Sequence, residues 1–236
     1  MARRQLETLK GFGLVPDAPV VWQSERSAFY QRALENLVEQ DLAFPCFCSR
    51  SDLLASAGIH RGCVANPSGR RPAFRLRVPT QRLCFEDEFR GSYCQELADE
   101  VGDVVLKRAD GLWAYQLAVV VDDGLQGMTQ VVRGADLLDS TPRQILLQRM
   151  LEYPAPAYAH VPLIRDAGGR KLGKSLHSVA VDAAEPLPAL RLAFRLLGQD
   201  PAALDGEGSI ERRLQRALSE FQPAKVPVVD CVLDVG

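Results

Sequence analysis

The chain has 236 residues, of which 47% are hydrophobic and 25% are charged, and its 28 basic and 30 acidic side chains leave a formal net charge of −2. These values are typical of a globular protein and exclude a disordered, collagen-like or coiled-coil chain. The clearest apolar run, 112–121, is far shorter than the roughly 18–20 residues of a membrane span. No apolar segment follows the basic N-terminus, so we expect a cytoplasmic protein without a membrane anchor.

The first hundred residues divide into two parts of different composition. Residues 4–12 predict a short helix that ends at glycine, 20–22 predict a brief strand, and 25–40 predict an amphipathic helix with Ser24 or Ser27 as its cap. Residues 42–102 are instead rich in cysteine and arginine and contain short alternating runs such as 74–78. This change predicts an insertion with a small fold of its own.

Strand-like and helix-like segments alternate from Val104 onward. The order is 104–106, 112–121, 129–132, a helix at 141–151, and 158–164. Such alternation predicts an α/β fold with a parallel sheet covered by helices. Helix-friendly segments at 190–197 and 210–221 follow. We expect 1–41 and 104–185 to form the two parts of one domain, 42–103 to be the insertion, and 186–236 to be a short helical tail.

Three of the six cysteines and one histidine lie within 18 positions, as Cys46, Cys48, His60 and Cys63. Thiolate and imidazole are the ligands of structural zinc, and two short ligand pairs joined by about a dozen residues commonly form such a site. Four protein ligands leave no open coordination position. The alternative is a set of buried free thiols beside a surface histidine. We interpret Cys84, Cys94 and Cys231 as buried small apolar residues.

Two further clusters carry groups that bind charged ligands. Lys171 and Lys174 follow a Gly-Gly turn and suit a polyphosphate, although a solvated basic turn is an alternative. Arg133 lies at the end of a predicted strand, where a guanidinium can bind a carboxylate through two parallel hydrogen bonds, and Tyr115 adds a hydroxyl nearby. The alternative for Arg133 is a structural ion pair with Asp136.

Six segments together resemble the class I aminoacyl-tRNA synthetases of the glutamyl type. They are Trp-Gln-Ser-Glu-Arg at 22–26, Cys-x-Cys at 46–48, Ala-Tyr-Gln-Leu-Ala at 114–118, Val-Val-Val-Asp-Asp at 119–123, Val-Val-Arg-Gly-Ala-Asp at 131–136 and Lys-Leu-Gly-Lys-Ser at 171–175, in the family's order. Only 61 residues follow Ser175, which leaves no room for an anticodon-binding domain. The chain is therefore more similar to the shortened paralogues that glutamylate queuosine in tRNA(Asp).

The resemblance implies a Rossmann-type parallel sheet with a zinc-bearing insertion, and a ligase activity. Glutamate and ATP with Mg²⁺ would form glutamyl-adenylate, and glutamate would pass to queuosine at the wobble position of tRNA(Asp). Tyr115 and Arg133 match the glutamate-binding positions. Lys174, with Lys171 in the same loop, matches the catalytic lysine that contacts the ATP phosphates. Cys46, Cys48 and Cys63 match zinc ligands, with His60 as the fourth. We expect a monomer.

The family's opening strand and its His-x-Gly-His-like motif have no counterpart in this sequence, which therefore resembles an N-terminally incomplete catalytic domain. We expect weak ATP binding and slow adenylate formation as a consequence. Two alternatives follow: a fragment of a glutamyl-tRNA synthetase that charges the tRNA 3′ end, or a non-catalytic remnant that binds zinc and RNA.

An arginine-rich stretch without acidic residues lies between Asp52 and Glu86. Its arginines are Arg61, Arg70, Arg71, Arg75, Arg77 and Arg82. They could meet RNA phosphates on one positive face. Equally, Arg75 and Arg77 alternate with apolar residues as in a half-buried strand.

Overall fold

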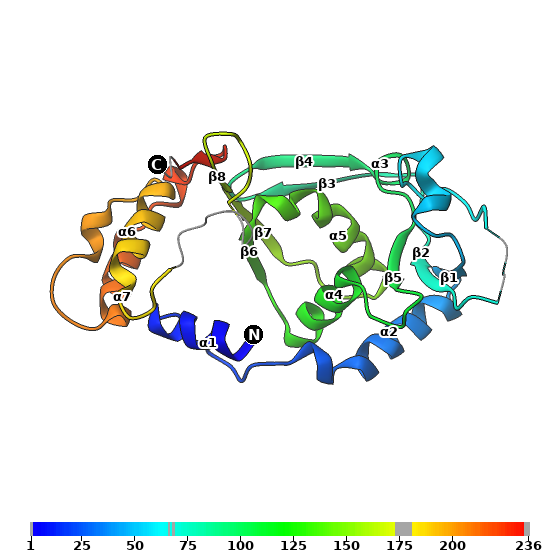
Figure 1. Ribbon diagram of the computed structural model, residues 1–236, viewed down its shortest axis with the longest axis horizontal. Helices are drawn as coiled ribbons and strands as arrows, with labels where there is room; N and C mark the ends of the chain where they lie inside the picture. Colours follow the sequence, from blue (N-terminus) through cyan, green and yellow to red (C-terminus); the bar gives the residue numbers. More distant parts are fainter. Residues whose placement is uncertain (1, 66, 68, 173–180, 234–236) are drawn as a thin grey trace. The chain divides into compact units, whose positions relative to one another are not determined.

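The computed structural model describes residues 2–65, 67, 69–172 and 181–233 (Figure 1). The chain forms two compact units, and we describe each by itself. The larger unit contains Trp22–Val132 and Leu137–Ala159, and the smaller contains Met1–Val21, Arg133–Asp136 and His160–Gly236. The chain passes from one unit to the other within strands β6 (Gln130–Gly134) and β7 (Ala157–Val161).

The larger unit begins with a 3₁₀ turn, η1 (Gln23–Glu25), and helix α2 (Ser27–Glu39). The predicted serine caps are wrong: Arg26 occupies the cap position, and no side chain caps the helix. Ser24 lies inside η1, and the Ser27 hydroxyl instead accepts a hydrogen bond from Nε1 of Trp113 at 2.8 Å. The residues 20–22 that predicted a strand are irregular.

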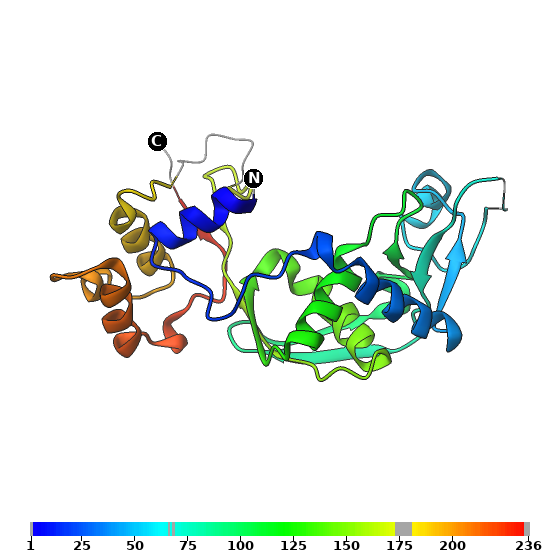
Figure 2. The same cartoon turned by 90° about the horizontal axis from the view of Figure 1, so that it is seen from below.

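A three-stranded antiparallel sheet lies beside α2, as both views show (Figures 1 and 2). Its order is β1 (Ala43–Cys46), β2 (Ala73–Leu76) and β5 (Val104–Lys107). A 3₁₀ segment, η2 (Ser51–Ser56), follows β1. The strands expected at 74–78 and 104–106 are thereby confirmed within one or two residues.

A second sheet has the order β4-β3-β7-β6. Strand β3 (Arg82–Asp87) is antiparallel to β4 (Gly91–Glu96) and parallel to β7. The first sheet is therefore antiparallel and the second is mixed, and the expectation of a parallel sheet needs correction. The physical reason is the short link between β3 and β4, because a link of three residues can join only antiparallel neighbours.

This hairpin also corrects the interpretation of two cysteines. Cys84 and Cys94 are directly opposite each other in the β3-β4 register, with Cα atoms 4.1 Å apart, and form a disulfide. Cys84 is exposed, so the pair does not serve as buried apolar residues. Cys231 is half-buried, and its thiol donates to the carbonyl of Leu196 at 3.3 Å.

Helices α3 (Leu97–Glu100), α4 (Tyr115–Gln126) and α5 (Thr141–Met150) complete the larger unit, with a 3₁₀ segment, η3 (Ala135–Ser140), before α5. Their apolar side chains join those of α2 and the strands in one core. Its fully buried leucines include Leu37, Leu76, Leu106, Leu117 and Leu147, each at most 1% exposed. Burying one such side chain contributes about 1.5–3 kcal/mol, so this core fixes the helix that carries Tyr115.

The smaller unit is mainly helical. Helices α1 (Ala2–Gly11), α6 (Pro186–Leu196) and α7 (Ile210–Glu220) belong to it, with the 3₁₀ segments η4 (Pro201–Leu204) and η5 (Pro223–Lys225). Its core contains Phe12, Leu190, Leu204 and Ala217. Strand β8 (Ile164–Arg165) pairs in parallel with β9 (Cys231–Val232). Among the described residues, no helix is long and apolar enough to cross a membrane.

Candidate functional site

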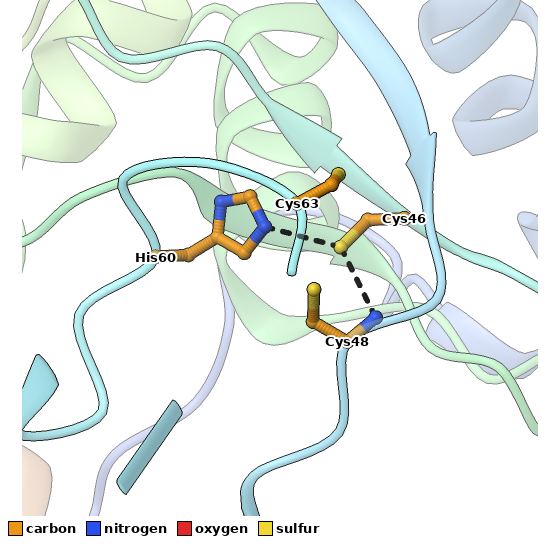
Figure 3. A group of neighbouring side chains, drawn as sticks. All are labelled: Cys46, Cys48, His60 and Cys63. Atoms are coloured by element: carbon orange, nitrogen blue, oxygen red, sulfur yellow. Dashed lines mark hydrogen bonds between the residues drawn. The ribbon is translucent and has the colours of Figure 1, made fainter. Parts of the chain in front are cut away.

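The four predicted metal ligands lie together in the larger unit (Figure 3). Cys46 ends strand β1, and Cys48, His60 and Cys63 follow on the loops after it. Their Sγ and imidazole nitrogen atoms all lie within 4.8 Å of one another, and His60 Nε2 is 3.2 Å from Cys46 Sγ. Cys46, Cys48 and His60 are buried, whereas Cys63 is exposed. The alternative of a surface histidine is therefore wrong.

The orientation of His60 is fixed by Asp103, which sequence analysis missed. The imidazole Nδ1 lies 2.7 Å from Asp103 Oδ2, and because a carboxylate accepts, Nδ1 carries the proton and Nε2 presents its lone pair to the three thiols. The backbone N–H of Asp103 also donates to the carbonyl of His60 at 2.8 Å. Gly102 precedes it with φ +66°, and a Cβ there would lie 2.5 Å from that carbonyl. Glycine is therefore required for this approach.

The thiols differ in acidity. Burial raises the pKa of Cys48, but hydrogen bonds from the backbone of Ala65 and Val64 and from Cys46 outweigh it and lower that pKa. Burial, together with the hydrogen bonds and charges of Cys46 and Cys48, raises the pKa of Cys63 to about 11. Because Cys63 resists ionisation beside two other thiols, a bound cation would stabilise the cluster. The positive charge would offset the repulsion between the thiolates.

The donor set fits zinc. Two ligand atoms that each lie about 2.0–2.3 Å from one tetrahedral ion are about 3.5–4 Å from each other. The four donor atoms here all lie within 4.8 Å of one another, so they are close enough to surround one ion. Three sulfurs and one imidazole are soft or borderline donors, and the carboxylate behind His60 is the usual outer partner of a zinc-bound imidazole.

Arg75 supports this cluster from within the fold. It is only 8% exposed, and its Nη1 donates to the carbonyl of Asp103 at 3.0 Å. The other arginines of the stretch, Arg61, Arg70, Arg71, Arg77 and Arg82, are exposed. Arg75 therefore does not belong to the exposed positive face. The alternative of a half-buried strand needs correction as well, because the neighbouring residues Arg75 and Leu76 are both buried.

Tyr115 is the first residue of α4 and is 46% exposed. It lies on a groove of about 700 Å³ that Cys48, Arg75, Arg108 and Trp113 also line. The N–H of Ala114 donates to the carbonyl of Leu106 at 2.9 Å, which fixes the start of α4 on strand β5. Tyr115 therefore presents its phenol at an open, basic groove next to the cysteine cluster.

Asp122 holds α4 to the segment at 22–30. Its carboxylate accepts hydrogen bonds from Gln23 at 3.0 Å, Arg26 at 2.5 Å and Tyr30 at 2.8 Å, and Asp122 is 6% exposed. Burial, reinforced by the hydrogen bond to Asp122, raises the pKa of Tyr30 to about 12. Two of the donors belong to the Trp-Gln-Ser-Glu-Arg segment, whose role here is to orient α4.

In the smaller unit, Arg133 and Asp136 have different partners. Nε of Arg133 donates to Nε2 of His160 at 3.1 Å. Asp136 accepts a hydrogen bond from Lys171 at 2.6 Å, which lowers the pKa of Asp136, and Arg133 lowers it further through its charge. A Cβ at Gly134 would lie 2.6 Å from Oδ1 of Asp136, so the glycine makes room for this carboxylate.

A tight hairpin places Lys171. The N–H of Asp166 donates to the carbonyl of Arg170, and Leu172 donates to Ile164, both at 2.9 Å. Gly169 has φ +78°, as the turn requires. Lys174, the other predicted lysine of the loop, lies outside the described residues.

Sequence analysis singled out the ligand cluster and Tyr115, Arg133 and Lys171, whose roles stay predictions, but it did not single out Asp103, Asp122 or His160. Tyr115 belongs to the larger unit, and Arg133 and Lys171 belong to the smaller. A buried acidic or imidazole group in a predicted strand or apolar helix is the signal that could have pointed to Asp122 and His160.

Comparison with known proteins agrees with this fold and these motifs. Residues 64–202 match the family model "tRNA synthetases class I (E and Q), catalytic domain". The structure of a glutamate tRNA ligase from Elizabethkingia meningosepticum CCUG26117 superposes with a TM-score of 0.74 at 23% identity, over 98% of this chain and 56% of that one. The glutamate-tRNA synthetase of Elizabethkingia anophelis gives 0.75 at 23% identity, over 99% and 58%. At this identity the likeness shows the fold alone.

Relatives of higher identity are more specific. A glutamyl-Q tRNA(Asp) synthetase of Xanthomonas campestris pv. campestris (strain 8004) is 55% identical over 229 residues, which are 97% of this chain and 77% of the relative. One from Burkholderia mallei (strain ATCC 23344) is 48% identical over 97% of this chain and 79% of the relative. The chain therefore belongs to the class I tRNA synthetases and is a ligase of that family. Within the family, its relatives of this identity are glutamyl-Q tRNA(Asp) synthetases.

Proposed function

We propose that the chain activates glutamate with ATP and transfers it to queuosine at the wobble position of tRNA(Asp). The observation that carries this proposal is the 55% identity over 97% of the chain to a protein named glutamyl-Q tRNA(Asp) synthetase. The fixed guanidinium of Arg133 supports it, since such a group can recognise a carboxylate.

In the first step a carboxylate oxygen of glutamate attacks the α-phosphorus of ATP, and pyrophosphate leaves. Arg133 and Tyr115 bind glutamate in this proposal. Lys171, and Lys174 in the same loop, offer ammonium groups to the phosphates on which negative charge develops. Because Lys171 already pairs with Asp136, its ammonium group is held in place before ATP arrives. ATP enters with Mg²⁺, which neutralises the departing pyrophosphate.

In the second step a hydroxyl of the queuosine cyclopentenediol attacks the activated carbonyl, and AMP leaves. Exposed arginines of the cysteine-bearing segment, Arg70 and Arg71 among them, suit the phosphates of the anticodon stem-loop. Their electrostatic contribution does not depend on base sequence, so the choice of queuosine falls to groups near the reacting carbonyl.

We propose that Cys46, Cys48, His60 and Cys63 hold a structural zinc ion. These four residues would fill all four positions of a tetrahedral ion, and holding it would link the end of β1 to the loop that contains His60 and Cys63. Its contribution is to folding rather than to the transfer reaction.

Glutamate-dependent exchange of labelled pyrophosphate into ATP tests the activation step. We expect the exchange, however slow, to depend on glutamate, and glutamine or aspartate should not replace it. Arg133→Ala should raise the KM for glutamate about 100-fold, and Tyr115→Phe about tenfold, because each removes a hydrogen bond to the substrate. Tyr153→Phe is a matched control, since Tyr153 lines a separate groove along α2 and should leave the KM unchanged. An unchanged KM in Arg133→Ala would reject the carboxylate anchor.

A further inference from the structure

The hydrogen bond between Arg133 and His160 determines the protonation state of His160. A guanidinium only donates, so the imidazole Nε2, 3.1 Å from Nε of Arg133, must be the acceptor. His160 is therefore neutral and carries its proton on Nδ1. It is fully buried, at 0% exposed, and is the last of the three consecutive buried residues of strand β7.

This contact fixes the plane of the guanidinium. Arg133 is the fourth residue of β6, and β6 and β7 are neighbours in one sheet, so both ends of the hydrogen bond are attached to strands. The bond uses the Nε edge of the guanidinium. With Nε used in this bond, the edge formed by Nη1 and Nη2 is the other edge through which a guanidinium offers two parallel N–H groups to a carboxylate.

Holding the guanidinium in one orientation reduces the cost of binding. An arginine side chain has up to about 2 kcal/mol of rotamer freedom, and a substrate that must immobilise it loses that amount of affinity. The packing of His160 in the strand removes this freedom before the substrate arrives.

We propose that His160 is a positioning residue that aligns Arg133 for the substrate carboxylate, through the acceptor Nε2 of its neutral imidazole. The inference rests on the role of Arg133 in the function proposed above. His160 itself need not touch glutamate, ATP or the RNA.

Four variants test it: His160→Leu, His160→Gln, Arg133→Ala and the double variant His160→Leu/Arg133→Ala. Leucine removes the acceptor, whereas the amide oxygen of glutamine restores an acceptor near the place of Nε2. In pyrophosphate exchange we expect His160→Leu to raise the KM for glutamate at least tenfold, with kcat and the KM for ATP changed less than twofold. His160→Gln should recover most of the loss. In the Arg133→Ala background, His160→Leu should have no further effect.

The protonation state of His160 in the unaltered protein provides a second readout, which does not depend on enzymatic activity. In ¹H–¹⁵N correlation spectra that detect the imidazole nitrogens, the signal absent from His160→Gln should show a protonated Nδ1 and an unprotonated Nε2. A protonated Nε2 would overturn the inference.

The kinetic outcomes separate the two proposals. If Arg133→Ala impairs glutamate use and His160→Leu does not, the positioning role is wrong and the proposed function stands. If His160→Leu adds its full effect in the Arg133→Ala background, His160 acts on its own and the inference is also overturned. If neither the unaltered protein nor any variant uses glutamate, the proposed function fails and the inference fails with it.

Discussion

Nζ of Lys171 lies 2.6 Å from Oδ2 of Asp136, which joins the lysine loop to the segment that carries Arg133. The two side chains are 49% and 43% exposed. Solvent at this exposure limits the contribution of such a pair to stability to at most about 1 kcal/mol. Its significance is therefore positional: it holds an ammonium group beside the Arg133–Asp136 segment.

The first prediction concerns the pH dependence of this pair. The hydrogen bond from Lys171 holds the pKa of Asp136 below its ordinary value of about 3.9. Because the pKa of Asp136 is lower in the folded state, the pair contributes its full stabilisation of the fold above the ordinary pKa. This stabilisation is lost as the pH falls through the lowered pKa. Melting curves of the unaltered protein and Asp136→Asn should therefore differ by a constant amount from pH 5 to 8 and converge below pH 4. Divergence at acidic pH would contradict the assignment.

The second prediction concerns the buried carboxylate of Asp122. Asp122→Ala should lower the free energy of unfolding by about 3–5 kcal/mol, because it leaves the Arg26 charge and the Tyr30 hydroxyl buried without their acceptor. Tyr30→Phe removes one hydrogen bond to a charged group and should cost about 1.5–3 kcal/mol. Urea denaturation measures both. Glu39→Ala, an exposed change on the same helix α2, should stay within about 0.5 kcal/mol.

The third prediction concerns the metal. Purified protein should contain one zinc ion per chain by plasma emission spectrometry, and Cys46→Ser should lose it together with thermal stability. Asp103→Asn should weaken zinc binding about 10–100-fold, because it removes the carboxylate that orients His60. Cys231→Ser changes a half-buried thiol outside the cluster and should keep full zinc content. Equal zinc content in all three variants would reject the site.

The fourth prediction concerns RNA. Replacing Arg70 and Arg71 by alanine should weaken binding of a tRNA(Asp) anticodon stem-loop and reduce the slope of log Kd against log salt by about one for each lost phosphate contact. Arg3 and Arg4 are an equally adjacent, exposed pair on α1 and provide the matched control. If the variant without Arg70 and Arg71 binds the stem-loop as tightly as the variant without Arg3 and Arg4, Arg70 and Arg71 do not belong to the RNA surface.

Features of the fold could be predicted from the sequence where the residues that determine them are close together in the chain. Helices α1, α2, α5, α6 and α7 were predictable within a few residues, because their apolar spacing and end signals are local. The cysteine cluster was predictable for the same reason, since all of its ligands lie within 18 positions.

The supporting contacts were not predictable, because their partners are distant in the chain. Asp103 is 43 residues from His60, and Asp122 is 96 residues from Arg26. The local sequence marks Asp122 only as an acidic residue in an apolar helix, and it does not distinguish Asp103 from a carboxylate in solvent. The direction of strand pairing and the disulfide of Cys84 and Cys94 depend in the same way on register, which the tertiary fold determines.

Transfer of labelled glutamate to RNA tests the proposed activity most directly. The protein, ATP with Mg²⁺ and radiolabelled glutamate would be incubated with a tRNA(Asp) anticodon stem-loop that contains queuosine, and with the same stem-loop that contains guanosine instead. We predict label on the queuosine stem-loop alone, and loss of that acceptor activity after periodate cleaves its cyclopentenediol. Label confined to the 3′ end of intact tRNA, or none on either stem-loop, would contradict the account.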